Sequence, residues 1–135
     1  MEDRLVGTVL DGRYAVKEVI GTGGMSIVYK AEDTQEGRLV ALKFLKEEFV
    51  REPKSRRRFL NESRAIAMLS HENIVDVLDV NFEGDVQYIV MEYLEGPTLK
   101  EYMVEHGALD VYDALHIVEQ ILSALKHAHE RGVVH

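Results

Sequence analysis

Residues 21–28 read Gly-Thr-Gly-Gly-Met-Ser-Ile-Val, and a short distance further on residues 40–43 read Val-Ala-Leu-Lys. The segments 14–20 and 27–31, on either side of the glycines, are rich in β-branched and aromatic residues, which favour strands. The glycines therefore fall in a turn between two strands. A second turn at residues 35–37 leads into a third expected strand, residues 39–45.

The rest of the chain alternates between the two kinds of element. Pro53 fits the first turn of a helix, where its missing N–H needs no partner, and helical spacing continues to about residue 70. Two further strands, 74–82 and 86–93, are joined by a hairpin-type turn at residues 83–85. Helices are expected over 98–106 and 110–131, the second capped by Asp110 and closed by Gly132. Strand connections this short exclude parallel crossovers, so the order predicts an α+β fold with a five-stranded antiparallel sheet.

Composition narrows the function classes. The 135 residues are enough for one small domain. The net charge of −8 weighs against nucleic acid as a partner, because phosphate neutralisation needs a basic face. With no cysteine, disulfide scaffolds, Cys-ligated zinc and thiol catalysis are excluded. No apolar run is long enough to span a bilayer, and the start lacks a signal-peptide pattern, so we expect a soluble intracellular chain.

The glycine turn itself has two interpretations. Glycines allow backbone N–H groups to approach phosphate oxygens closely, but a plain hairpin turn with glycines at positive φ explains the same residues equally well. A dinucleotide site needs a helix after the glycines, and a P-loop needs Gly-Lys-Ser/Thr, so neither fits. A glycine loop between antiparallel strands, ending in Val28, is the protein-kinase arrangement, although Ser26 replaces its third glycine.

Two charged residues follow at spacings that a kinase requires. Alternation puts Ala41 and Lys43 on one face of a strand, where Lys43 could reach a phosphate; the alternative is a surface lysine on an edge strand. Phe59 and Glu62 share a helix face with Ile66 and Leu69 by three-and-four spacing. A carboxylate within an apolar stripe needs a cation, which Lys43 could supply. The alternative is that Glu62 lies at the margin of the stripe and reaches water.

Together these motifs resemble the small lobe of the eukaryotic-like (Hanks-type) bacterial Ser/Thr protein kinases, particularly the PASTA-kinase subgroup. The resemblance runs essentially from end to end. Residues 71–75, His-Glu-Asn-Ile-Val, are similar to the entry to the fourth kinase strand, and residues 88–94, Tyr-Ile-Val-Met-Glu-Tyr-Leu, to the fifth strand and hinge. The resemblance implies a small lobe over residues 1–95 and the start of a large lobe over 96–135, truncated at the catalytic-loop histidine.

The resemblance also implies roles for individual residues. Lys43 and Glu62 would be the catalytic pair that aims the lysine at the phosphates. Met91 would be the gatekeeper, the backbone of Glu92 and Leu94 would bind the adenine edge, and Thr98 would take the place of an acidic ribose ligand. The residues implied to bind ATP are Ile20, Gly21, Thr22, Gly23, Gly24, Met25, Ser26, Ile27, Val28, Ala41, Lys43, Met91, Glu92, Leu94 and Thr98.

Several other residues receive structural or regulatory roles from the same resemblance. Ile66 and Val77 match regulatory-spine positions. Arg58 lies where relatives contact a phosphorylated activation loop, but a solvated helix face explains residues 56–58 equally well. His71 and His129 match structural histidines. No metal site is predicted, because His127 and His129 are two apart on a helix and do not converge.

The resemblance ends at His135, which would be the histidine of the kinase H-R-D motif. The aspartate of that motif, the magnesium ligands and the activation loop would all follow it. We therefore expect a parent Ser/Thr kinase that uses ATP and Mg²⁺, acts on protein hydroxyls and has this domain in the cytoplasm, possibly below a single membrane span. The 135 residues alone are expected to be inactive. The alternative is a non-catalytic nucleotide-binding or dimerisation module.

Self-association is also predicted, through either of two surfaces. The last helix carries an apolar stripe that the remainder of a large lobe would normally cover, and an uncovered patch of this kind recruits partners. The resemblance implies a second interface, on the small lobe, for back-to-back dimers. A light-scattering mass equal to that of the monomer at all concentrations would exclude association through the helix. The stripe comprises Leu115, Val118, Leu122, Leu125 and Ala128.

Overall fold

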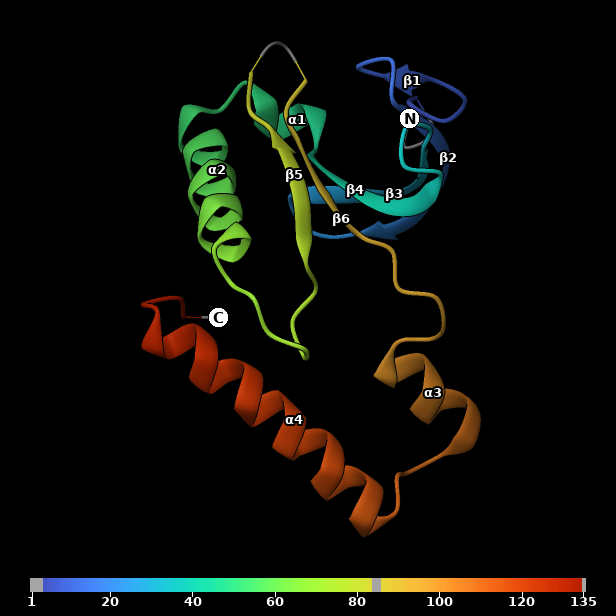
Figure 1. Cartoon of the computed structure of the whole chain (residues 1–135), viewed down its shortest axis with the longest axis vertical. Coiled ribbons are helices and arrows are strands. Elements are labelled where there is room, and N and C mark those ends of the chain that lie inside the picture. Colours follow the sequence, from blue (N-terminus) through green and yellow to red (C-terminus); the bar gives the residue numbers. More distant parts are fainter. Residues whose placement is uncertain (1–3, 84–85, 135) are drawn as a thin grey trace. The chain divides into compact units, whose positions relative to one another are not determined.

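The computed structural model describes residues 4–83 and 86–134, which divide into two compact units (Figure 1). The first unit holds the chain up to Met68 together with Asp76–Tyr93, and the second holds Leu69–Val75 together with the chain from Leu94 onward. The strands are β1 Val9–Leu10, β2 Tyr14–Thr22, β3 Ser26–Asp33, β4 Arg38–Leu45, β5 Val77–Asn81 and β6 Tyr88–Glu92, and the helices are α1 Glu47–Val50, α2 Pro53–Ala67, α3 Leu99–His106 and α4 Val111–Glu130.

One antiparallel sheet forms the first unit, in the order β1-β2-β3-β4-β6-β5. The predicted α+β class and antiparallel pairing are confirmed. The sheet has a sixth strand, β1, that was not predicted, because two residues are too few to show alternation. The short helix α1 was also missed, because four residues are too few to show helical periodicity. Part of the predicted turn at residues 83–85 lies outside the described residues.

The main core lies on one face of this curled sheet. Alternate residues of β3 and β4 point into it, and Ala31, Val40 and Leu42 have no exposed surface. Aromatic rings contact one another edge-on across the strands, as between Tyr29 and Phe44, whose ring centres are 5.5 Å apart. The buried members of this core are Tyr14, Val16, Ile27, Tyr29, Ala31, Val40, Leu42, Phe44, Tyr88 and Val90.

A second, smaller cluster on the other face holds α2, which lies alongside β5 (Figure 1). Pro53 is the first residue of the helix, as predicted. Phe59 packs with Leu45 of β4 and Ile89 of β6. The helix buries Phe59 between two serines four residues away on either side, Ser55 and Ser63.

The predicted apolar face of α2 was partly wrong. Glu62 is exposed, Ile66 is 37% exposed, and the helix ends at Ala67, so Leu69 lies beyond it. The buried Ser63 satisfies its hydroxyl by donating to the carbonyl oxygen of Phe59. Because serine is polar, Ser63 was not assigned to the buried face of the helix. Glu62, one residue earlier, was placed there instead.

The second unit contains the two later helices, and both predicted ends of α4 are confirmed. Asp110 caps it by accepting hydrogen bonds from the backbone N–H groups of Tyr112 and Asp113. Gly132 follows the last turn with φ +76°, a conformation that favours glycine. His71 and Asn73 attach Leu69–Val75 to this helix, the latter by donating to the carbonyl oxygen of Gln120.

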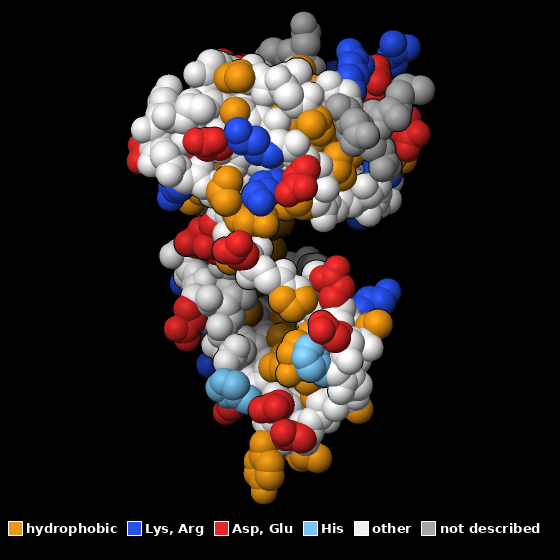
Figure 2. Space-filling view, turned by 90° about the vertical axis from the view of Figure 1, so that its right-hand side faces the viewer, with side chains coloured by type: hydrophobic (Ala, Val, Ile, Leu, Met, Phe, Trp, Pro, Cys, Tyr) orange, Lys and Arg blue, Asp and Glu red, His pale blue; other side chains and the backbone are white. Residues whose placement is uncertain are grey.

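Much of the apolar stripe of α4 reaches the surface. Leu115 and Leu122 are about 60% exposed, whereas Ala128 is buried. Figure 2 shows hydrophobic side chains at the surface of the second unit, interspersed with carboxylates. The self-association expected from this stripe stays a prediction. None of the helices in the described part of the chain combines the length and apolar character that a bilayer crossing needs.

A buried ion pair fixes the turn between β3 and β4. The Nε and Nη2 atoms of Arg13 donate to the two carboxylate oxygens of Asp33 at 2.8 and 2.7 Å. Asp33, with 1% of its surface exposed, also accepts from the backbone N–H groups of Gln35 and Glu36. The hydrogen bonds from Arg13 hold the pKa of the Asp33 carboxyl far below its ordinary value.

We predict that Asp33→Asn destabilises the chain and flattens its stability profile in acid. A depressed folded-state pKa contributes stability that is present above the unfolded-state pKa of about 3.9 and is lost as pH falls below it. The unfolding free energy of the native sequence should fall progressively as the pH drops from about 4 to 2, and that of the variant less so. Urea unfolding at several pH values measures both effects.

The matched control is Glu32→Gln, which removes a half-exposed carboxylate 3.2 Å from the Lys17 ammonium. An exposed pair of this kind contributes at most about 1 kcal/mol, so Asp33→Asn should cost clearly more at neutral pH. Equal losses in the two variants, or an unchanged acid slope in Asp33→Asn, would contradict the role of this pair.

Candidate functional site

The glycine-rich segment forms a tight reversal between β2 and β3. Gly21 and Thr22 end β2, Ser26 begins β3, and the N–H of Gly23 donates to the carbonyl oxygen of Ser26 at 2.8 Å. Just before the turn, Val19 pairs with Tyr29 and Gly21 with Val28, so Ile20 is an extra residue in the ladder. This bulge leaves Ile20 44% exposed.

Two of the three glycines in this segment, Gly21 and Gly24, are not required by the fold, whereas a Cβ atom on Gly23 would lie only 3.3 Å from Oγ of Ser26. Gly21, Gly23 and Gly24 are all absent from the residues with positive φ, unlike Gly37 in the next turn at φ +67°. A Cβ atom on Gly24 would meet nothing within 4 Å, and one on Gly21 would make an ordinary contact with Val28. The alternative of a hairpin turn with glycines at positive φ is therefore wrong here. Open space therefore lies beside Gly24.

The pairing of the strands places the predicted site residues in rows across one face of the sheet. Val28, Lys43 and Ile89 are directly opposite one another on β3, β4 and β6, and Ala41 and Met91 form the next row. Paired residues point to the same face. Since Ile89 packs against Phe59, this is the face that α2 covers, and Lys43 projects toward the helix side.

Lys43 is partly buried and its ammonium is unpaired. It forms no hydrogen bond or ion pair with any residue in 4–83 or 86–134. The neighbouring β3 lysine behaves differently: Lys30 lies 3.5 Å from the Glu18 carboxylate and 5.1 Å from the centre of the Tyr93 ring. A cation on a sheet face with no protein anion beside it is suited to an anionic ligand.

Glu62 lies on α2 but does not pair with Lys43. Its carboxylate accepts a hydrogen bond of 2.8 Å from Nε of Arg58, one helical turn earlier, and its side chain is 60% exposed. This contact raises the pKa of the Arg58 guanidinium above its ordinary value. The alternative that Glu62 reaches water at the margin of the stripe is therefore correct in this conformation. The partner role of Arg58 was not predicted, although the spacing of four residues was a usable signal.

Near the end of β6, Met91 and Glu92 are held by different forces. Met91 packs against the cluster of Leu45, Phe59 and Ile89. Glu92 makes two hydrogen bonds with the backbone of Asp76: its N–H donates to the carbonyl oxygen at 3.0 Å, and its carboxylate accepts from the N–H at 2.9 Å. The sequence did not indicate this connection, which fixes the position of the strand just before the predicted hinge.

The remaining predicted site residues, Leu94 and Thr98, belong to the second unit. Leu94 is 61% exposed. Thr98 is the N-cap of α3 in a capping box: its hydroxyl accepts from the N–H of Glu101, and the Glu101 carboxylate accepts from the Thr98 N–H at 2.7 Å. These hydrogen bonds lower the pKa of the Glu101 carboxyl. The ribose role of Thr98 stays a prediction, beside the helix-capping role that the structure shows.

The other residues named from the sequence lie as follows. Val77 is partly buried against the Phe59 cluster, whereas Ile66 is more exposed. Nδ1 of His71 accepts from the Asn73 N–H at 3.0 Å, which agrees with a loop-capping histidine. Burial lowers the pKa of His127. Within the described ranges no three His, Asp or Glu side chains are grouped to hold a metal ion, and His135 is outside those ranges.

Comparisons with known proteins agree with this geometry. The protein kinase domain family matches residues 14–135. The chain is 47% identical over 131 residues to the serine/threonine-protein kinase PrkC of Bacillus subtilis, covering 97% of this chain and 20% of that kinase. It is 42% identical to the serine/threonine-protein kinase PknA of Mycobacterium tuberculosis, covering 96% of this chain and 31% of PknA.

Solved structures of kinase domains also match the chain. The crystal structure of the Mycobacterium tuberculosis PknI kinase domain matches with a TM-score of 0.78 at 30% identity, covering 96% of this chain and 52% of that domain. The chain thus spans about half of a solved kinase domain and a fifth to a third of the curated kinases that it matches.

We predict opposite outcomes for alanine at two turn glycines. Gly24→Ala should leave the free energy of unfolding unchanged or raise it by up to about 1 kcal/mol, because the position is open and its φ suits any residue. Gly37→Ala should lower it by about 1 kcal/mol, because φ is +67° there. Urea unfolding measures both. A large loss for Gly24→Ala would mean that the fold, and not a ligand, requires this glycine.

Proposed function

The chain belongs to the protein kinase domain family, and from this premise we propose that it forms the ATP-binding part of a serine/threonine protein kinase. The complete enzyme would transfer the γ-phosphoryl group of ATP to hydroxyl groups of protein substrates. One observation carries the proposal: the unpaired Lys43 ammonium lies on the sheet face next to a glycine turn with open space beside Gly24.

The fit to a nucleotide is supported by the chain's own chemistry. Apart from the Gly23 N–H, which donates to Ser26, backbone N–H groups in the turn from Thr22 to Ser26 can come close to phosphate oxygens, because the glycines add no Cβ in the way. Lys43 adds a positive charge two residues from Ala41, whose small side chain leaves room for a flat ring. We assign Ile20, Val28 and Ala41 to the adenine ring, and Met91, Glu92 and Leu94 to the gatekeeper and hinge.

Lys43 must be aimed at the phosphates, and we assign that task to Glu62. In the conformation described here Glu62 is held by Arg58 instead. Both side chains are largely exposed, and an exposed pair one helical turn apart contributes only about 0.3–0.5 kcal/mol. A change of the ion-pair partner of Glu62 from Arg58 to Lys43 therefore costs little free energy once a bound nucleotide positions the lysine. Glu62 acts here as a positioning residue, since it acts through Lys43.

ATP supplies the phosphoryl group and Mg²⁺ would neutralise its charge, but we assign no magnesium ligand to these 135 residues. In the family the catalytic aspartate, the magnesium ligands and the activation loop come after the position of His135. We place the domain in the cytoplasm, where ATP is available.

We predict that Lys43→Met weakens ATP binding by about tenfold or more, because a charge-assisted contact to phosphate is lost. Fluorescence titration with a labelled ATP measures the dissociation constant, and circular dichroism verifies the fold. Adenosine, which has no phosphates, should bind both forms equally.

The matched control is Lys17→Met, which removes an exposed β2 lysine paired with Glu32. This change should alter ATP affinity less than twofold. Equal ATP affinity in the native chain and Lys43→Met would refute the role of Lys43.

We also predict that the 135 residues alone transfer no phosphate. Without a base for the acceptor hydroxyl or magnesium ligands, positioning of ATP does not complete the reaction. Incubation with radiolabelled ATP and Mg²⁺, followed by electrophoresis, should show no label on the chain or on a generic protein substrate. Time-dependent labelling that disappears in Lys43→Met would contradict this prediction.

A further inference from the structure

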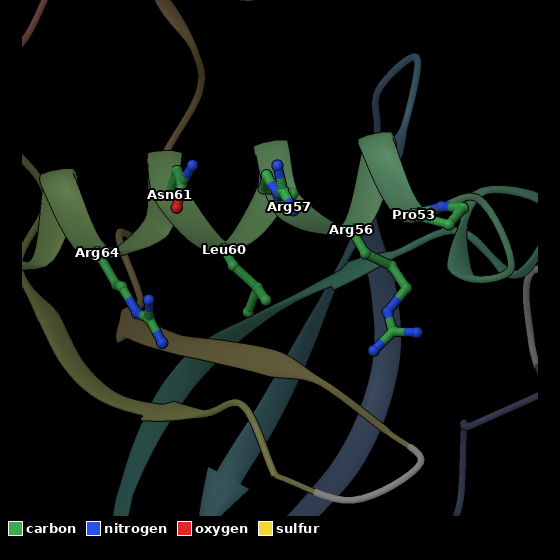
Figure 3. Close-up of a pocket in the computed structure, with 6 residues that line it drawn as sticks. All are labelled: Pro53, Arg56, Arg57, Leu60, Asn61 and Arg64. Carbon is green, nitrogen blue, oxygen red and sulfur yellow. The ribbon is translucent and has the colours of Figure 1, made fainter.

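The outer flank of α2 carries a hollow that no residue of the proposed ATP site shares. Its volume is about 440 Å³, and we call it the arginine hollow. Figure 3 shows Arg56, Leu60 and Arg64 projecting from one side of the helix toward the strands, with Arg57 and Asn61 on the neighbouring side. The lining residues are Pro53, Arg56, Arg57, Leu60, Asn61 and Arg64.

This flank is distinct from the one that carries Glu62. Successive residues of a helix are rotated by about 100°, so residues four apart nearly align. Arg56, Leu60 and Arg64 therefore form one row, about a quarter turn to one side of the buried Phe59. Arg58 and Glu62 form another row, on the other side of Phe59. A ligand could occupy the arginine hollow without touching the Arg58–Glu62 pair.

The positive charge of the hollow is not neutralised by the fold. Within the described residues, the guanidinium groups of Arg56, Arg57 and Arg64 form no ion pair with a carboxylate. The nearby carboxylate of Glu52 instead accepts a hydrogen bond from the Ser55 hydroxyl. The chain carries a net charge of −8, yet six of its 16 Lys and Arg residues fall within residues 51–64.

The hollow continues toward β5 and includes apolar surface. A second hollow of about 420 Å³ shares Arg64 and is otherwise lined by Val80, Asn81, Phe82 and Glu83. The Arg64 guanidinium lies 5.5 Å from the centre of the Phe82 ring, so it stands where the two hollows join. Leu60 is partly buried, and Val80 is 37% exposed. The surface thus combines guanidinium groups, most of them at the Arg56 end, with apolar patches at Leu60, Val80 and Phe82 and a carboxylate at Glu83.

From these features we propose that the arginine hollow and its continuation bind an extended anionic peptide of a partner protein. An acidic or phosphorylated side chain pairs with Arg56 and Arg57, and an apolar side chain further along the peptide packs on Leu60. Guanidinium groups suit this role because they form paired hydrogen bonds with phosphate and carboxylate oxygens. The open, elongated surface fits a peptide better than a small molecule, which is usually enclosed.

Charge complementarity sets the direction of the peptide. The anionic side chain lies at the Arg56 end, because the Glu83 carboxylate at the other end repels it. A peptide that carries a cationic side chain instead is repelled by the guanidinium groups of Arg56, Arg57 and Arg64 and does not bind. The competing explanation is that the arginines only solvate an exposed helix face, in which case peptide sequence has no effect on binding.

Fluorescence anisotropy with labelled peptides of about twelve residues tests the proposal on the full 135-residue chain. In a Gly/Ser background, one peptide carries phosphothreonine followed three residues later by Leu, and a second replaces phosphothreonine by Glu. Three others replace it by Thr or by Lys, or replace the Leu by Ala. The first should bind at least tenfold more tightly than the Thr and Lys peptides.

Variants of the chain test whether the peptide binds at the arginine hollow. Arg56→Glu/Arg57→Glu, or Arg56→Gln/Arg57→Gln if the first fails to fold, should weaken the phosphothreonine–Leu peptide at least tenfold. Lys100→Glu/Lys126→Glu makes the same change in net charge as the first variant on the second unit, and should alter affinity less than twofold. Leu60→Ser should weaken the Leu peptide and leave the Ala peptide unchanged.

Three results would overturn the proposal: no binding of the phosphothreonine or Glu peptides, equal binding of all peptides, or equal losses in the two double charge variants. Tighter binding of the phosphothreonine peptide than of the Glu peptide would identify a phosphorylated partner, and equal binding an acidic one. None of these readouts depends on ATP, so failure here leaves the proposed nucleotide role to its own test.

Discussion

The alternation of β4 between two different environments is the constraint on which the rest of the structure depends. Val40, Leu42 and Phe44 lie on its core face, and the first two of these have no exposed surface. A shift of one residue would move this whole set out of the core, so the register is fixed by the burial of these side chains. Lys43 is consequently held on the opposite face, beside Val28 and Ile89.

In the first unit, the strand register therefore fixes the position of Lys43, whereas only a weak ion pair fixes the position of Glu62. The sheet positions Lys43 through packing, which is strong and local. The helix positions Glu62 through an exposed pair with Arg58, which is weak. Such a difference suits a site that must rearrange when a ligand arrives, because the scaffold stays in place while one ion pair exchanges. The Phe59 cluster limits how far α2 can move without exposing apolar surface.

Sequence reasoning succeeded mainly for features that depend on residues close together in the sequence. It failed mainly for features that depend on how separate helices and strands pack. The glycine turn, the alternation around Lys43 and the caps at Asp110 and Gly132 are local signals, and each was found in the structure. The buried Ser63 and the hydrogen bonds from Glu92 to Asp76 depend on which flank of a helix or strand meets another element. The Arg58 partner of Glu62 is instead a local contact, which the spacing of four residues could have indicated. Thr98 was assigned to a ribose from the resemblance alone, and its capping box was overlooked even though Glu101 lies three residues later.

A crystal structure of the kinase domain that contains this chain, bound to a non-hydrolysable ATP analogue, tests the central claim most directly. The account predicts that the Lys43 ammonium lies within hydrogen-bond distance of both a nucleotide phosphate and the Glu62 carboxylate, with the Arg58 contact broken. A bound nucleotide whose phosphates lie away from Lys43, with Glu62 still paired to Arg58, would contradict it.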